Sequence, residues 1–172
     1  MQEEDVIKIL KKDLNFSEKS IFQLKNFSES LIEINKSYNF ISQNTEKDIW
    51  HRHILDCAQL VKFIDFNGIS LADLGSGAGL PGMVLAIYNQ NKNFHVKLYE
   101  KSPVKRKFLE KAASKLNTKI SILSNIYEEN IDSEIIVCRA FKKIDQVIQV
   151  SREMIKRPHK LIILKGQNAQ EE

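Results

Sequence analysis

The chain has few of the residues that stabilise small secreted proteins, and none of its segments suits a membrane. Its 172 residues include only two cysteines, Cys57 and Cys138, which is too few for a disulfide framework, so we expect two free thiols. The longest stretch without a charged residue, 74–91, contains four glycines and a proline, and these exclude a transmembrane helix. The first five residues contain three acids, unlike a signal peptide. We therefore expect a cytoplasmic protein without a membrane partner.

Glycine is scarce as well, with six residues, and five of them lie between Gly68 and Gly82. The remaining composition, 42% hydrophobic and 28% charged, is typical of a globular protein of one domain. The 26 basic and 22 acidic residues leave a net charge of +4. This mild excess permits a nucleic-acid partner without requiring one.

Residues 1–66 have helical periodicity and are interpreted as an N-terminal helical cap. Apolar residues recur every three or four positions in three stretches, which predicts three helices. Ser17 is expected to cap the second helix, and Thr45, with Asp48 three residues later, the third. The expected buried face of that third helix consists of Ile49, His53, Cys57, Leu60 and Ile64.

From residue 67 to residue 172 the pattern changes to short apolar runs that alternate with helices. Strands are predicted at 69–74, 94–99, 120–123, 135–138 and 161–164, with helices up to about 88, from 103 and at about 144–155. This alternation predicts an α/β, Rossmann-like core with a parallel sheet and helices on both faces, forming one compact domain with the cap. In the helix that Ser102 and Pro103 begin, the expected buried residues are Val104, Phe108, Leu109, Ala112 and Leu116.

The glycine cluster lies between the first predicted strand and a helix, where open α/β sheets bind ligands. A phosphate-binding P-loop needs lysine after its last glycine, but Met83 follows Gly82; a dinucleotide motif needs glycine where Leu80 stands. Glu100, at the end of the second strand, is placed to accept both hydroxyls of a ribose. No basic residue within 73–82 could neutralise a pyrophosphate, so S-adenosylmethionine is the expected ligand. The alternative is a structural turn.

Six segments resemble the bacterial small-subunit ribosomal RNA guanine-N7 methyltransferase family RsmG, also called glucose-inhibited division protein B. The similarity spans the chain from about residue 20 to its end. They are Asn-Lys-Ser-Tyr-Asn (35–39), Arg-His-Ile-Leu-Asp (52–56), the glycine loop (73–82), Lys-Arg-Lys-Phe-Leu (105–109), Cys-Arg-Ala-Phe (138–141) and Leu-Lys-Gly-Gln (164–167).

The resemblance implies a class I S-adenosylmethionine-dependent methyltransferase that acts on N7 of a guanine in 16S ribosomal RNA. The expected partner is small-subunit ribosomal RNA or the 30S particle, and we expect a monomer. Two departures stand out. Ile126 occupies a position where the family usually has arginine, and the family's sheet continues past the Lys-Gly segment, so the last strands are expected to be missing.

The same resemblance, together with the strand ends, identifies candidate site residues. The expected cofactor-binding residues are Asp73, Gly75, Gly77, Gly79, Leu80, Glu100, Tyr127, Glu128 and Arg139. The expected catalytic residues are Arg139, Lys165, His53 and Asn39. No metal site is expected, because His51 and His53 diverge on a helix.

Each assignment has a structural alternative. Glu100 could be a solvated strand end, His53 a core histidine, and Arg139 the partner of a nearby carboxylate. The proposed reaction itself needs no general base, because guanine N7 has a lone pair and no proton. The competing functions are a methyltransferase for another substrate and a non-catalytic RNA-binding module.

Overall fold

Five short strands form a parallel sheet in the computed structural model, which describes residues 1–128 and 130–166. The strand order is β3-β2-β1-β4-β5, so the strand before the glycine loop has β2 and β4 as neighbours. This confirms the predicted parallel α/β core. The strands are β1 (Ser70–Leu74), β2 (His95–Tyr99), β3 (Ser121–Leu123), β4 (Ile135–Arg139) and β5 (Lys160–Leu164).

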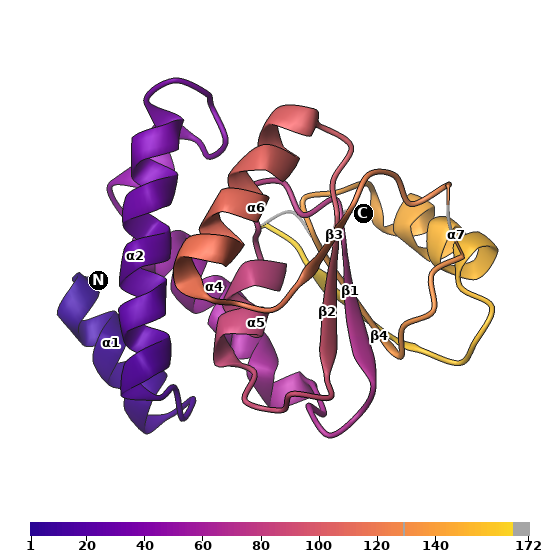
Figure 1. The fold of residues 1–172 in the computed structure, drawn as a ribbon, viewed down its shortest axis with the longest axis horizontal. Helices are drawn as coiled ribbons and strands as arrows, with labels where there is room; N and C mark the ends of the chain where they lie inside the picture. The colour runs from indigo at the N-terminus through magenta and orange to yellow at the C-terminus, as the bar shows by residue number, and fades with distance from the viewer. Residues whose placement is uncertain (129, 167–172) are drawn as a thin grey trace.

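Helices cover both faces of this sheet, as Figure 1 shows. On one side lie α4 (Asp56–Ala58), α5 (Gly82–Tyr88) and α6 (Pro103–Leu116), with α1 (Glu3–Lys12) and α2 (Glu18–Asn35) packed outside them. On the other side lies α7 (Ile144–Met154). The remaining helical turns are α3 (Gln43–Glu46), η1 (Trp50–Leu55) and η2 (Gln59–Phe63). Within the described part of the chain, no helix has both the length and the apolar character needed to cross a membrane.

The core consists of two hydrophobic clusters, one on each face of the sheet. Strand side chains alternate between faces, and thus Leu71 joins the cluster with the N-terminal helices while Ala72 and Leu74 join the cluster beneath α7. The first cluster is continuous from Val6 in α1 to Val137 in β4. The N-terminal helices are therefore packed into the same core as one face of the sheet.

The predicted start of the third helix is wrong, although its buried face is confirmed. Ser42, and not Thr45, precedes the first turn of α3. The Thr45 hydroxyl donates to the Ser42 carbonyl within that turn and also contacts His53, so it does not cap a helix. The chain then passes through a π-helical turn, η1, and such turns occur often near functional sites.

The start of α6 also differs from the prediction in two respects. Val104 is 44% exposed, and the buried face of α6 begins at Phe108. Ser102 precedes the helix as expected, but its side chain makes no capping hydrogen bond. Its backbone N–H instead donates to Glu100 Oε1 at 2.7 Å.

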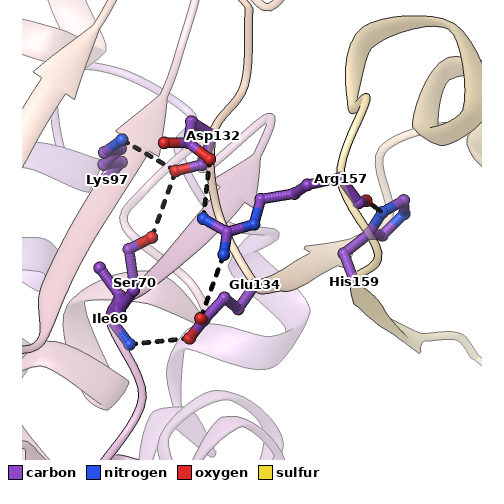
Figure 2. A network of polar contacts seen from close by, with 7 residues as sticks. All are labelled: Ile69, Ser70, Lys97, Asp132, Glu134, Arg157 and His159. Atoms are coloured by element: carbon purple, nitrogen blue, oxygen red, sulfur yellow. Dashed lines mark hydrogen bonds and ion pairs between the residues drawn. The ribbon is translucent and has the colours of Figure 1, made fainter.

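Polar contacts connect the amino ends of β1, β4 and β5, at the end of the sheet opposite the glycine loop (Figure 2). Arg157 contacts Asp132 Oδ1 at 2.8 Å and Glu134 Oε1 at 3.2 Å. Glu134 also accepts the backbone N–H of Ile69 at 2.8 Å. These ion pairs are partly exposed, so they are worth about 1 kcal/mol at most. Their role is to hold the amino ends of these strands together, far from the candidate site.

Candidate active site

The glycine loop turns sharply at the carboxyl end of β1. Gly75 has φ +71° and Gly77 has φ +57°, values that side chains rarely adopt. The backbone N–H groups of Gly75 and Ser76 both donate to the Tyr99 carbonyl at 2.9 Å, which joins the loop to the end of β2. A Cβ at Gly75 would lie 2.3 Å from the Phe141 ring, whereas at Gly77 the nearest atom is 3.8 Å away. The loop is therefore packed at Gly75 and open at Gly77.

Glu100 connects the glycine loop to the start of α6. One carboxylate oxygen, Oε2, accepts the Gly77 N–H at 2.8 Å, and Oε1 accepts the Ser102 N–H at 2.7 Å. A carboxylate offers about four lone-pair sites, so each oxygen keeps the capacity to accept one more hydrogen bond. This geometry suits a pair of neighbouring hydroxyl groups, and it shows that Glu100 is no freely solvated strand end.

Asp73 lies beneath the loop and does not line the cavity. Its Oδ2 accepts the Gly82 N–H at 2.8 Å, and its buried Oδ1 has no partner among the described residues. Burial raises the pKa of this carboxyl to about 7. Gly79 is also turned inward, since a Cβ there would lie 2.8 Å from Leu109. Both residues therefore shape the loop from below.

A cavity of about 540 Å³ opens beside the loop, a size within the range of small-molecule sites. The glycine loop and Glu100 line it together with residues 40–41 and 139–142. Seven of the predicted site residues line it: His53, Gly75, Gly77, Leu80, Glu100, Tyr127 and Arg139.

Three other predicted residues lie outside the lining, in addition to Asp73 and Gly79. Asn39 is exposed on the loop after α2. Glu128 accepts a hydrogen bond from the Ser124 hydroxyl at 2.7 Å, and Ser124 itself lines the cavity. Lys165 donates to the Lys142 carbonyl at 2.8 Å. Gln167, the last residue of the Leu-Lys-Gly-Gln segment, lies outside the described residues.

Arg139 links the end of β4 to the helical cap. Its Nη2 donates to the Arg52 carbonyl at 2.9 Å, and its Nη1 lies 3.5 Å from the Cys57 sulfur. No carboxylate in residues 1–128 or 130–166 forms an ion pair with it. The guanidinium is therefore held by neutral groups beside the cavity, with N–H donors left over, since arginine has five.

His53 is buried in η1 and is neutral at pH 7. The Thr45 hydroxyl donates to the Ser42 carbonyl at 3.0 Å, so it accepts from His53 Nε2–H at 2.8 Å. The Nδ1 atom then carries the lone pair, and it has no partner among the described residues. Burial, together with the charges of Arg139 and Arg52, lowers the pKa of His53 to about 4.

This lowered pKa predicts a pH dependence of stability. The folded-state pKa of about 4 lies below the ordinary value of 6.5. The stability that neutral His53 contributes to the folded state is therefore complete above pH 6.5 and is lost as the pH falls toward 4. Relative to pH 7, we expect His53 to lower the free energy of unfolding by about 1–2 kcal/mol at pH 5. Urea titrations of the parent and of His53→Gln should show the difference. Parallel pH profiles for the two proteins would contradict it.

Sequence reasoning missed several residues that line the same cavity. They are Phe40, Ile41, Lys101, Lys105, Phe141 and Lys142. Phe141 belongs to the Arg-Ala-Phe segment, and Lys101 directly follows Glu100, so their positions after strand ends were the available signal. Phe40 and Lys105 carried no such signal, because they meet only through packing of the cap on α6. The described residues contain no group of three or more potential metal ligands.

The fold resembles methyltransferases of known structure. The precorrin-6y C5,15-methyltransferase from Geobacter metallireducens aligns with a TM-score of 0.53 at 11% identity, covering 68% of this chain and 65% of that chain. Coclaurine N-methyltransferase, solved with N-methylheliamine and SAH, aligns with a TM-score of 0.54 at 16% identity. The alignment covers 95% of this chain and 60% of that chain. At this identity the likeness establishes the class I methyltransferase fold.

Relatives at higher identity identify the family. The ribosomal RNA small subunit methyltransferase G of Rickettsia felis is 41% identical over 149 residues, covering 86% of this chain and 76% of that protein. The protein of the same name from Pelagibacter ubique is 36% identical over 168 residues, covering 94% of this chain and 78% of that protein. The family model for rRNA small subunit methyltransferase G matches residues 20–172. The chain therefore belongs to the rRNA small subunit methyltransferase G family.

Proposed function

We propose that the protein transfers a methyl group from S-adenosylmethionine to N7 of a guanine in the 16S ribosomal RNA of the small subunit. One observation carries this proposal: the glycine loop, Glu100 and four basic side chains line a single cavity. Among residues 1–128 and 130–166, its lining contains Lys101, Lys105, Arg139 and Lys142 and one carboxylate, that of Glu100. A neutral or cationic adenosyl ligand suits the glycine loop and Glu100, and an RNA phosphate suits the basic side chains. Such a substrate places the enzyme in the cytoplasm.

The residues present fit the methyl donor. Gly77 leaves its backbone open to a ligand, and Glu100 can accept two ribose hydroxyls through its remaining lone pairs. Residues 73–82 contain no lysine or arginine, so the loop favours an adenosyl group over a pyrophosphate. When bound, the donor supplies an electrophilic methyl group on a sulfonium. Ile126 and Tyr127 line the same cavity, and we expect them to cover the adenine.

On the acceptor side, the chain positions the guanine and needs no base. N7 attacks with its own lone pair, and the neutral His53 adds no positive charge that would repel the methylated base. Arg139 can donate to guanine O6 or to a phosphate through the N–H groups that Arg52 and Cys57 leave unused. Proximity of this kind contributes up to about 7–11 kcal/mol to a methyl transfer.

The test is transfer of labelled methyl from S-adenosylmethionine to small subunits that lack the modification, followed by mapping of the labelled base. We expect one guanine to carry the label at N7. Free guanosine triphosphate and a ribosomal protein fraction serve as controls and should stay unlabelled. Label in protein or on another base would identify a different methyltransferase. RNA binding without any cofactor heat in calorimetry would identify a non-catalytic RNA-binding module.

A further inference from the structure

An exposed aromatic ring lies beside a residue that lines the cavity. Tyr38, on the loop between α2 and α3, is 48% exposed. Its ring centroid lies 5.9 Å from that of Phe40, at an interplanar angle of 39°. Phe40 lines the cavity and packs edge-on against Phe108 of α6, with centroids 5.4 Å apart. Tyr38 is thus the outer member of an aromatic pair whose inner member is anchored in the core.

The loop that carries this pair is ordered by one buried side chain. Asn35 Oδ1 accepts the backbone N–H groups of Phe40 at 2.8 Å and Ile41 at 3.0 Å. Its amide group donates to Glu46 of α3. The position of the two rings is therefore set before any ligand binds, and a preordered aromatic surface loses little conformational entropy on binding.

A cation lies beside the same pair. Lys105 Nζ is 5.8 Å from the centre of the Phe40 ring, and Lys105 lines the cavity together with Lys101. The C-terminal end of α2 and the N-terminal end of α6 lie at the same end of the molecule (Figure 1). An exposed ring and an ammonium group thus both lie beside Phe40, which lines the cavity that contains the glycine loop.

We propose that Tyr38 is a stacking platform for the base next to the target guanine, and that Lys105 pairs with a phosphate between the two nucleotides. This inference rests on the proposed function, because it adds the neighbouring nucleotide to the same site. Aromatic rings that stack on bases, with lysines that contact the backbone, are the usual means of holding single-stranded nucleic acid. Phe40 acts as a positioning residue that supports Tyr38 from the core side.

The platform is tested with Tyr38→Leu, which keeps an apolar side chain and removes the ring. Losing one stacked base is expected to raise the KM for unmodified small subunits about tenfold. We expect kcat at saturating subunit, the melting temperature and the affinity for S-adenosylhomocysteine to stay at parental values. Tyr38→Phe should restore the parental KM. Phe22→Leu is the matched control, because Phe22 is 67% exposed on α2 and lies outside the cavity lining.

The lysine is tested by the salt dependence of binding. Lys105→Gln should reduce the log–log slope of RNA affinity against salt by about 0.7, the value for one phosphate on a single strand. Lys119→Gln, an exposed lysine after the far end of α6, should leave the slope unchanged. An unchanged slope for Lys105→Gln would remove the lysine from the proposal.

Abasic RNA shows whether Tyr38 contacts a base. The intact probe is a fluorescent RNA of eleven nucleotides, with uridines around one central guanine. Two further probes each carry a single abasic residue, one on the 5′ side of the guanine and the other on its 3′ side. The parent should lose affinity for one of the two abasic probes, and Tyr38→Leu should bind that probe and the intact RNA equally well. If the parent does not discriminate, or binds none of the probes, the platform is refuted. A raised KM for subunits without discrimination would assign Tyr38 to a protein component of the subunit.

These readouts separate the platform from the proposed function. A parent that transfers no methyl group to subunits refutes the proposed function, whereas the abasic probes still decide whether Tyr38 stacks on a base. A parent that methylates guanine N7, with Tyr38→Leu at the parental KM, leaves the proposed function intact and refutes the platform.

Discussion

Replacing Arg139 with alanine is expected to reduce methyl transfer on the order of 100-fold or more, the usual cost of losing a donor that stabilises the transition state. Arg139 lines the cavity at the end of β4, and its guanidinium keeps free N–H groups beyond those used on Arg52 and Cys57. These groups are placed to hold the guanine as positive charge develops on it. The measurement is single-turnover methyl transfer to unmodified small subunits, with enzyme in excess.

Arg139 also joins the sheet to the helical cap, so its structural role must be measured separately. We expect Arg139→Ala to melt at a lower temperature but to bind S-adenosylhomocysteine with nearly parental affinity. Arg139→Lys should also lose transfer, because an ammonium group cannot reproduce the forked contact of a guanidinium. A folded, cofactor-binding Arg139→Ala enzyme that transfers methyl at the parental rate would show that the residue only holds the cap.

The second large effect is expected at Glu100. Glu100→Gln should weaken the binding of S-adenosylhomocysteine by about 100-fold or more, because two hydrogen bonds to a charged acceptor contribute roughly 1.5–3 kcal/mol each. The amide would in addition turn its NH₂ group toward the N–H of either Gly77 or Ser102, which the carboxylate now accepts. Isothermal calorimetry measures the affinity directly. Glu110→Gln, an exposed acid on α6, is the matched control.

A ligand lacking the ribose 2′-hydroxyl distinguishes direct contact from support of the loop. The parent should bind the 2′-deoxy form of S-adenosylhomocysteine more weakly than the normal form, and Glu100→Gln should bind both forms alike. If the parent binds the two forms equally, Glu100 does not contact the ribose. Its effect would then come from the glycine loop alone.

Most of the fold could be predicted from local patterns. The parallel sheet follows from the alternation of short apolar runs with helices, and the five strands lie within one residue or so of their expected positions. The buried face of the third helix was also correct, because the apolar spacing persists through the π-helical turn. The start of that helix was wrong, since Thr45 has the residue type of a cap but its hydroxyl is bonded to Ser42.

The prediction of site residues succeeded where their positions follow from strand ends, and it failed where they follow from packing. Glu100 directly follows β2 and Arg139 is the last residue of β4, and these two strands are the neighbours of β1. Both residues line the cavity. Asn39 was predicted from its segment, but the neighbouring Phe40 lines the cavity while Asn39 is exposed. The reason is that Asn35 holds the loop in a turn that directs Phe40 toward α6.

The class of fold, the family and the place of the glycine loop can be inferred without coordinates, because they depend on residue order, spacing and motifs. Three facts emerge from the structure alone: Asp73 lies beneath the loop, the Arg52 carbonyl holds Arg139, and Tyr38 pairs with Phe40, which lines the cavity. Each of these facts depends on contacts between segments far apart in the chain. Burial, orphaned polar atoms and shifted pKa values arise from such contacts, and no local pattern encodes them.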